Sequence, residues 1–197
     1  MMKNWKTLLL ALCIPVCGFS LEKLDEKYLI KMGDPDSKVQ IIQYFSMTCP
    51  HCLSLFKKDF QIIKEKYLDT KKASWIFHPI PLDSLTIQLM DCLSKLNPRQ
   101  KEIFFEALFD TIIIQDGSDI VLFLIQEAMK TFNHPIPELD NKSYITKTQA
   151  FTDAFNYIRQ EDRLDAVPAV EIDGILYRRE IPDLTFIEKQ MQGASND

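Results

Sequence analysis

The sequence predicts a mixed α/β fold in which two strand-containing parts are separated by a block of helices. Three observations lead to this prediction. A β-rich apolar run at residues 39–45 is followed by a helical pattern and a second β-rich run at 73–77. Helical patterns alone then occupy residues 84–164. Two short β-rich runs and a last helical pattern complete the chain, so strands and helices alternate only at its two ends.

Composition narrows the class of protein. The chain has 197 residues, of which 46% are hydrophobic and 26% are charged. This length suits one ordinary domain with an insertion, and the composition excludes a disordered or collagen-like chain. The formal net charge is −5, which is the wrong sign for a phosphate-binding surface. We therefore expect no nucleic-acid partner.

Residues 1–20 have the features of a signal peptide. They carry Lys3 and Lys6 near their start, continue with the apolar run 7–19, and offer the small residues Gly18 and Ser20 near their end. The apolar run is too short to cross a hydrocarbon core of ~30 Å as a helix, although an uncleaved anchor is the alternative. We expect export to the periplasm, where disulfides persist. Cleavage would leave three cysteines, Cys49, Cys52 and Cys92.

The first part of the fold is expected to be a βαβ unit. Residues 28–30 suit a short edge strand, and residues 39–45 are apolar enough for a buried one. The helix that follows places apolar residues at steps of three and four along one face, namely Leu53, Phe56, Phe60, Ile63 and Tyr67. Pro50 fits the first turn of this helix, where a missing N–H is no loss. Residues 73–77 are predicted as a second core strand around Trp75.

The middle of the chain is predicted to form four consecutive helices. Residues 84–96 form the first, which Asn97-Pro98 ends, and residues 99–114 form the second. Residues 119–132 are apolar nearly all round, so we expect a deeply buried helix. Residues 142–164 carry the fourth pattern on Phe151, Ala154, Phe155 and Ile158.

The end of the chain returns to β-structure. Residues 169–172 and 175–178 flank Asp173-Gly174, the strongest hairpin signal in the sequence. Pro182-Asp183 then opens a last helix, with Leu184, Ile187 and Met191 on one face. We therefore expect a ββα unit to close the fold.

The motif Cys49-Pro50-His51-Cys52 lies at the predicted strand-to-helix turn. A cysteine pair with this spacing can carry out redox chemistry or bind zinc. Zinc needs about four ligands, and Cys92, His78 and His134 supply no second closely spaced pair, so we expect no bound metal. A permanent structural disulfide is a further alternative, although so short a loop gains little chain-entropy stabilisation.

Electrostatics at this turn favours the redox interpretation. Cys49 sits at the predicted N-terminus of the helix, where free N–H groups of His51 and Cys52 and the helix dipole point at its sulfur. His51 can add positive charge or a hydrogen bond, and all of these favour thiolate over thiol. We expect Cys49 to be the exposed attacking sulfur and Cys52, one turn inward, to be the resolving one. Pro50 and His51 are the candidate tuning residues.

The segment from Tyr44 to Cys52 resembles the active-site strand and turn of the DsbA-like branch of the thioredoxin superfamily. Val167-Pro168-Ala169 lies just before the closing hairpin, where that family keeps a cis-proline loop. The resemblance covers nearly all of residues 28–191. It implies a thioredoxin fold with an inserted all-helical domain between its βαβ and ββα halves. The discontinuous thioredoxin domain would be 21–82 and 165–197, and the helical insertion 83–164.

The resemblance also implies an activity, which is the introduction of disulfides into reduced exported proteins. A substrate thiolate would attack the Cys49–Cys52 disulfide and form a mixed disulfide on Cys49, which a second substrate thiol would release. Val167 and a cis Pro168 would bind the substrate, because the cis bond leaves the Val167 backbone free to pair with a substrate strand. A membrane protein of the quinone-coupled DsbB type would reoxidise the pair. We expect a monomer with no cofactor other than the redox-active disulfide.

Other activities of the same superfamily remain as alternatives. A disulfide isomerase or reductase is one, but isomerases resemble dimers with a separate N-terminal dimerisation domain, and only about twenty residues separate the leader from the first core strand. Val167, rather than Thr, before the proline also resembles the oxidase pattern. A non-catalytic chaperone module is the other, although such modules usually lose one cysteine.

Several individual residues carry their own expectations. DsbA-like proteins often place an acidic residue six positions before the first cysteine, and here that position is Gln43, which cannot accept the proton of Cys52. Cys92 lies among apolar residues on a predicted helix, so we expect a buried, unpaired thiol. His78 and His134 each precede a proline and are expected in loops, with ordinary surface or hydrogen-bonded roles.

Overall fold

The computed structural model describes residues 24–114, 118–139, 141–160, 164–179 and 183–194. The predicted signal peptide, residues 1–20, lies outside the described residues. None of the described helices is both long and apolar enough to cross a membrane.

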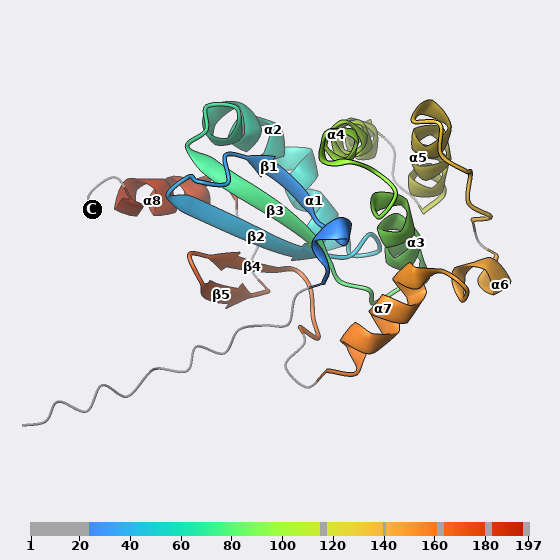
Figure 1. Cartoon of the computed structure of the whole chain (residues 1–197). Helices are drawn as coiled ribbons and strands as arrows, with labels where there is room; N and C mark the ends of the chain where they lie inside the picture. Colours follow the sequence, from blue (N-terminus) through green and yellow to red (C-terminus); the bar gives the residue numbers. More distant parts are fainter. Residues whose placement is uncertain (1–23, 115–117, 140, 161–163, 180–182, 195–197) are drawn as a thin grey trace, which may run out of the picture.

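Strands and helices follow the predicted order (Figure 1). A short 3₁₀ turn (Glu26–Tyr28) precedes β1 (Ile30–Gly33), β2 (Val39–Phe45), α1 (Pro50–Lys58), α2 (Phe60–Ile63), a π-helical turn (Lys64–Leu68) and β3 (Ala73–Pro79). Five helices follow, α3 (Ser84–Leu93), α4 (Pro98–Ile114), α5 (Ser118–Thr131), α6 (Lys142–Ile145) and α7 (Gln149–Ile158). The chain then forms β4 (Ala169–Ile172), β5 (Ile175–Arg178) and α8 (Leu184–Ala194).

The strands form a 5-stranded sheet in the order β1-β3-β2-β4-β5. β2 and β3 are parallel, whereas β1, β4 and β5 each pair antiparallel with their neighbours. The β4–β5 hairpin forms at the predicted turn, where Asp173 and Gly174 both adopt positive φ, as a tight type I′ hairpin requires. The α/β class and the thioredoxin-like order of elements are therefore confirmed.

The helices that lie between β3 and β4 in the chain, α3 to α7, gather at one end of the sheet (Figure 1). α1, α2, α4 and α8 pack on one face of the sheet, and the other face meets α3 and α7. α3 also contacts α7 and α5, so the helical block is packed internally as well as against the sheet.

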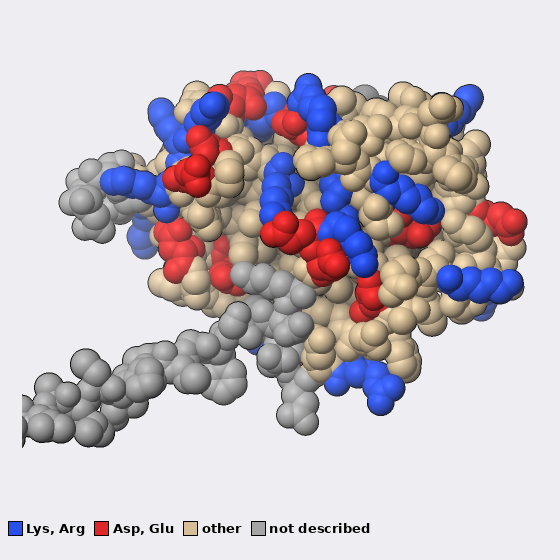
Figure 2. Space-filling view, in the orientation of Figure 1, with Lys and Arg blue, Asp and Glu red and all other residues tan. Residues whose placement is uncertain are grey.

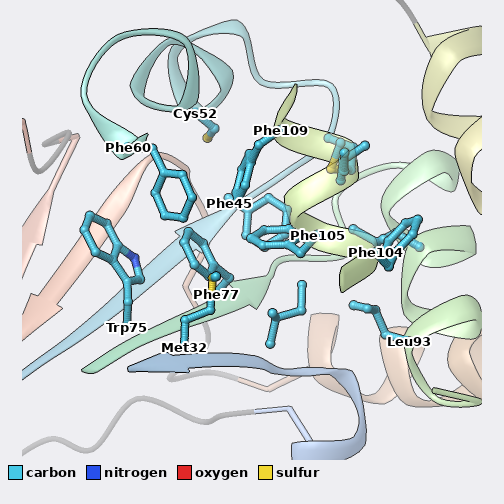
Figure 3. Packing of buried hydrophobic residues seen from close by; sticks show 14 of the residues in the cluster. Met32, Phe45, Cys52, Phe60, Trp75, Phe77, Leu93, Phe104, Phe105 and Phe109 are labelled. Carbon is cyan, nitrogen blue, oxygen red and sulfur yellow. The ribbon is translucent and has the colours of Figure 1, made fainter. Parts of the chain in front are cut away.

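The larger hydrophobic core is dominated by aromatic side chains (Figure 3). Phe77 of β3 lies at its centre, with ring centroids 4.5 Å from Phe105 and 5.6 Å from both Phe60 and Trp75. Cys52 projects from α1 toward this cluster. The predicted core position of Trp75 is confirmed, since its side chain has 0% exposure. Buried aromatic rings remove roughly 150–250 Å² each from water, so this cluster holds α2 and α4 against the sheet.

The opposite face of the sheet carries a smaller core that includes His78. The predicted loop position of His78 is wrong, because this residue belongs to β3 and is completely buried. Its Nε2 accepts a hydrogen bond of 3.0 Å from the Leu24 N–H, and its ring lies 5.0 Å from that of Tyr44. A ring nitrogen satisfied in this way lets a histidine replace an apolar residue in a strand.

The first strand and the last helix of the helical block depart from their predicted bounds. The edge strand is β1 at Ile30–Gly33 rather than residues 28–30, and Tyr28 lies in the 3₁₀ turn before it. The helix expected over 142–164 is divided into α6 and α7, because Thr148 adopts extended backbone (ψ 152) and its hydroxyl caps the Phe151 N–H. A hydroxyl that caps a new N-terminus competes with continuation of the previous helix.

Two predicted buried surfaces are partly exposed. α5 is not deeply buried: Val121, Ile125 and Met129 face the core, but Phe123 is 53% exposed. In α7 the buried face is Ala150, Ala154 and Tyr157, while the predicted apolar residues Phe155 and Ile158 are exposed. Both helices lie at the outside of the block and contact neighbours on one side only, so only one face of each is covered.

Charged side chains of both signs are interspersed over the face shown in Figure 2, and the surface above α4 and α5 is mostly uncharged. Several charged side chains of the protein form ion pairs, such as Lys66 with Glu188 at 2.6 Å and Lys64 with Asp69 at 2.9 Å. Exposed pairs of this kind contribute about 0–1 kcal/mol each. The face shown therefore presents no large patch of a single charge.

Candidate active site

Cys49 occupies the N-cap position of α1. Its carbonyl accepts the first intrahelical hydrogen bond, from the Leu53 N–H at 3.1 Å, and Pro50 is the first helical residue. Its sulfur accepts a hydrogen bond of 3.2 Å from the Cys52 N–H. The thiol thus takes the place of the oxygen that usually caps the third N–H of a helix. Negative charge on the Cys49 sulfur is favoured there, because it lies at the positive end of the helix dipole.

The two cysteines differ in exposure as expected. Cys49 is partly exposed, Cys52 is 0% exposed, and both are free thiols in this structure. Burial strongly raises the pKa of Cys52, and its hydrogen bond with Cys49 raises it further, whereas the Ser46 N–H lowers it as a donor to the sulfur. Cys52 is therefore held as a neutral thiol, and it must give up a proton before it can attack another sulfur.

Pro50 and His51 are exposed on the first turn of α1. The His51 carbonyl accepts a hydrogen bond of 2.7 Å from the Ser54 hydroxyl, which stabilises the turn. His51 is two residues after Cys49, at the same end of α1. The structure therefore leaves both residues where they can act on Cys49, and their role as tuning residues stays a prediction.

The loop at Val167-Pro168 reaches the same end of the sheet as the cysteines. β2 and β4 pair with Tyr44 opposite Ala169, so the two residues before Ala169 lie beside the end of β2 that leads to Cys49. The Val167–Pro168 peptide bond is cis, as expected. Pro168 is buried, and Val167 packs against the same core cluster as Cys49. The sheet thus brings the two predicted parts of the site together from distant segments of the chain.

Gln43 lies in the centre of β2 and is 1% exposed. The alternation of a strand places its side chain on the face of Ile41 and Phe45, the face that α1 covers. Within the described part of the chain, neither its Oε1 nor its Nε2 has a hydrogen-bond partner. An unsatisfied buried amide costs about 1–3 kcal/mol, so this position departs from ordinary core packing as well as from the expected carboxylate.

Sequence reasoning missed Asp83, the residue that caps α3. One carboxylate oxygen accepts hydrogen bonds from the hydroxyls of Ser46 at 2.6 Å and Thr48 at 3.0 Å, both in the turn before Cys49. The sequence Asp83-Ser84-Leu85-Thr86 carries the signal of a helix N-cap. No local pattern could reveal that the same carboxylate also reaches a turn more than thirty residues earlier in the chain.

Cys92 is completely buried in α3, and burial raises the pKa of its thiol to about 12. It is a free thiol, as predicted, and a neutral buried thiol is unreactive. No three His, Cys, Asp or Glu side chains among the described residues are grouped as metal ligands would be.

Known proteins resemble this chain at two levels. The thioredoxin family model described as "Thioredoxin" matches residues 25–187. A candidate protein-disulfide oxidoreductase of Rickettsia bellii is 41% identical over 54 residues, which are 27% of this chain and 20% of that protein. The chain thus matches about a fifth of the length of this curated relative.

Solved structures show the same fold over most of the chain. Wolbachia pipientis alpha-DsbA1 superposes with a TM-score of 0.63 at 22% identity, over 88% of this chain and 94% of that one. BdbD from Bacillus subtilis gives 0.62 at 14% identity, over 90% and 98%. A protein-disulfide isomerase from Novosphingobium aromaticivorans gives 0.59 at 14% identity, over 86% and 98%. The fold is that of DsbA-like proteins, and with the family match over residues 25–187 the chain belongs to the thioredoxin family.

Proposed function

We propose that the protein is a thiol–disulfide oxidoreductase that introduces disulfides into reduced exported proteins. The observation that carries the proposal is the geometry of the cysteine pair. A partly exposed Cys49 sulfur accepts the Cys52 N–H at the helix N-terminus, and Cys52 lies buried one turn inward. This arrangement stabilises the Cys49 thiolate and hence the reduced form, which makes the disulfide form a stronger oxidant.

The reaction begins with the pair as a disulfide. A substrate thiolate attacks the Cys49 sulfur, and the bond between the two cysteines breaks, so that Cys52 leaves with the electron pair and takes up a proton. The second substrate thiolate then attacks the substrate sulfur of the mixed disulfide and releases Cys49 as a thiolate. Two electrons pass from the substrate dithiol to the cysteine pair, and the substrate gains one disulfide.

We also propose where the protein acts, what it binds and how the cysteine pair is reoxidised. Residues 1–20 direct export to the periplasm, and Val167 and Pro168 line the place where a substrate segment binds. The Cys49–Cys52 disulfide is the only redox group, and a membrane oxidase of the DsbB type restores it. The protein works as a monomer and binds no nucleic acid.

A disulfide isomerase is the second candidate, since a structural neighbour bears that name. The reduction potential of the pair in glutathione buffers distinguishes the two. An oxidase is expected to have a potential less negative than about −180 mV, the value typical of protein disulfide isomerase. A value near −270 mV, as in thioredoxin, would contradict the oxidase proposal. Oxidation of a reduced, unfolded protein should also proceed faster than rearrangement of a scrambled one.

His51→Ala is expected to make the pair less oxidising. The substitution removes the side chain best placed to stabilise the Cys49 thiolate, and each tenfold loss of that stabilisation moves the potential by about 30 mV toward negative values. The potential and the thiolate absorbance at 240 nm, measured at fixed pH, test this. Gln61→Ala is the control, because it removes an exposed polar side chain from α2, outside the turn that carries the cysteines. Equal values for wild type and His51→Ala would show that the backbone N–H groups and the helix dipole alone stabilise the thiolate.

A further inference from the structure

We propose that Asp83, at the start of the helical block, is a positioning residue of the redox site, which holds the Ser46–Met47–Thr48 turn and through it both cysteines. The inference rests on the proposed function, because it concerns the same cysteine pair. It assigns a role to a residue outside the C-x-x-C motif and the Val167-Pro168 loop.

The carboxylate of Asp83 is the acceptor at the centre of a hydroxyl cluster. Its Oδ2 accepts hydrogen bonds from Ser46 Oγ at 2.6 Å, Thr48 Oγ1 at 3.0 Å and Thr86 Oγ1 at 2.8 Å. Its Oδ1 accepts the Thr86 N–H at 2.8 Å and so caps α3. The two carboxylate oxygens therefore have different partners, since Oδ1 caps the helix and Oδ2 accepts hydrogen bonds from three hydroxyls. Hydrogen bonds to a charged acceptor are stronger than those between neutral groups.

Every residue of the turn before Cys49 is tied to this cluster. The Met47 N–H donates to Thr86 Oγ1 at 3.0 Å, and the Thr48 N–H donates to Ser46 Oγ at 3.1 Å. Ser46 is 2% exposed and Thr86 is 0% exposed. The N–H groups of Met47 and Thr48 are therefore bonded to hydroxyls of the cluster, one from α3 and one from the turn itself.

Ser46 connects this cluster to both cysteines. Its carbonyl accepts the Cys49 N–H at 3.2 Å. Its own N–H acts on the sulfur of Cys52, where it lowers the pKa against the larger effect of burial. The Ser46 hydroxyl is held by Asp83 at the same time. A shift of Ser46 therefore changes the surroundings of both cysteines, and Asp83 is the group that prevents that shift.

The positioning role and the charge of Asp83 have opposite effects on the reduction potential of the cysteine pair. A nearby negative charge disfavours a thiolate, so removal of the charge alone would make the pair more oxidising. Loss of the anchor weakens the alignment of N–H groups with the sulfurs, and it makes the pair less oxidising. The sign of the change in potential therefore separates the two.

Asp83→Asn and Ser46→Ala are the two test variants. Asparagine keeps the N-cap of α3, but its amide NH₂ group cannot accept the three hydroxyl hydrogen bonds. Ser46→Ala removes one of these bonds and leaves the charge of Asp83 in place. For both we expect the equilibrium constant with glutathione to shift three- to tenfold toward the disulfide form. Ten-fold corresponds to about 30 mV.

Asp183→Asn is the matched control. Asp183 caps α8 through the Phe186 N–H at 2.8 Å, so the control removes one carboxylate from a helix N-cap outside the hydroxyl cluster, and we expect no shift. The double variant Ser46→Ala/Asp83→Asn should shift no more than the larger single variant, because both substitutions remove the same contact. Thermal unfolding of each variant reports any general loss of stability separately.

Three results would overturn the proposal. They are a more oxidising Asp83→Asn protein, a Ser46→Ala protein with the potential of wild type, and additive shifts in the double variant. Failure of the proposed function looks different. A wild-type protein whose cysteines do not exchange with glutathione overturns both ideas, whereas a wild-type protein that exchanges normally, with unchanged variants, overturns the positioning role alone.

Discussion

Cys49→Ala is expected to abolish oxidation of reduced proteins, whereas Cys52→Ala is expected to accumulate mixed disulfides on Cys49 with proteins that contain a disulfide. The physical reason is the difference in exposure, since Cys49 is partly exposed at the N-cap of α1 and Cys52 is completely buried. Only Cys49 can be reached by a second polypeptide. In Cys52→Ala the Cys49 thiolate can still attack a protein disulfide, and one sulfur of that disulfide leaves as a thiolate. The resulting mixed disulfide has no Cys52 thiol to resolve it, so it accumulates.

Non-reducing electrophoresis after incubation with a protein that contains a disulfide measures the trapped complex, and a reductant should release it. Cys92→Ala serves as the control, because Cys92 is also a buried cysteine but lies in α3 outside the redox turn. That variant should keep wild-type activity. If Cys49→Ala traps substrate and Cys52→Ala does not, the roles of the two cysteines are the reverse of those proposed.

Gln43→Glu is expected to speed the exchange step in which Cys52 resolves a mixed disulfide on Cys49, and to destabilise the fold. Cys52 is held as a neutral thiol by burial, and its proton needs an acceptor before it can resolve a mixed disulfide. A carboxylate on the α1-facing side of β2 can take that proton, which the amide cannot. The gain can reach about 100-fold, the low end of the effect of a positioned general base.

The loss of stability follows from the burial of the same position. Gln43 is 1% exposed and its amide has no hydrogen-bond partner among the described residues, so a carboxylate there is desolvated without compensation. The cost is several kcal/mol for a fully buried, unpaired charge. Burial raises the pKa of such a glutamate in the folded state. Its charged form is therefore disfavoured by folding, and the stability deficit should grow as the pH rises above about 4.3, the unfolded value.

Rates of mixed-disulfide resolution against pH, for wild type and Gln43→Glu, test the proton path. Urea unfolding at pH 4 and pH 7 tests the stability effect. Gln43→Leu is the control, since it removes the unsatisfied amide without adding a proton acceptor, and it should be at least as stable as wild type. Superimposable rate profiles for wild type and Gln43→Glu would show that position 43 is not on the proton path.

The features that could be predicted from the sequence depend on residues that are close together in the chain. The period-2 and period-3.6 patterns locate β2, β3, α1 and the β4–β5 hairpin. The geometry of the Cys49-Pro50-His51-Cys52 motif follows from its local sequence, because a helix that begins at Pro50 brings the Cys52 N–H toward the Cys49 sulfur. Local hydrogen bonds within a few residues are determined by the sequence around them.

Contacts between distant segments decided the rest. The exposure of Phe123 depends on how many neighbours α5 has, and the burial of His78 depends on Leu24, which lies 54 residues away in the chain. The helical periodicity of residues 119–132 shows that the segment is apolar, but it cannot show which face meets another helix. The packing of the helical block selects that face.

The clearest division lies within the site itself. The sequence alone predicts a C-x-x-C motif at a helix N-terminus and a proline before a hairpin. It does not determine where these two features lie relative to each other in the folded protein. The pairing of Tyr44 with Ala169 brings Val167 and Pro168 to the cysteines, and the first turn of α3 brings Asp83 to Ser46. The sequence determines which side chains can react because that depends on chemical type and local helix geometry. The tertiary structure decides what holds and surrounds them, because sheet register and helix packing join segments that no local pattern connects.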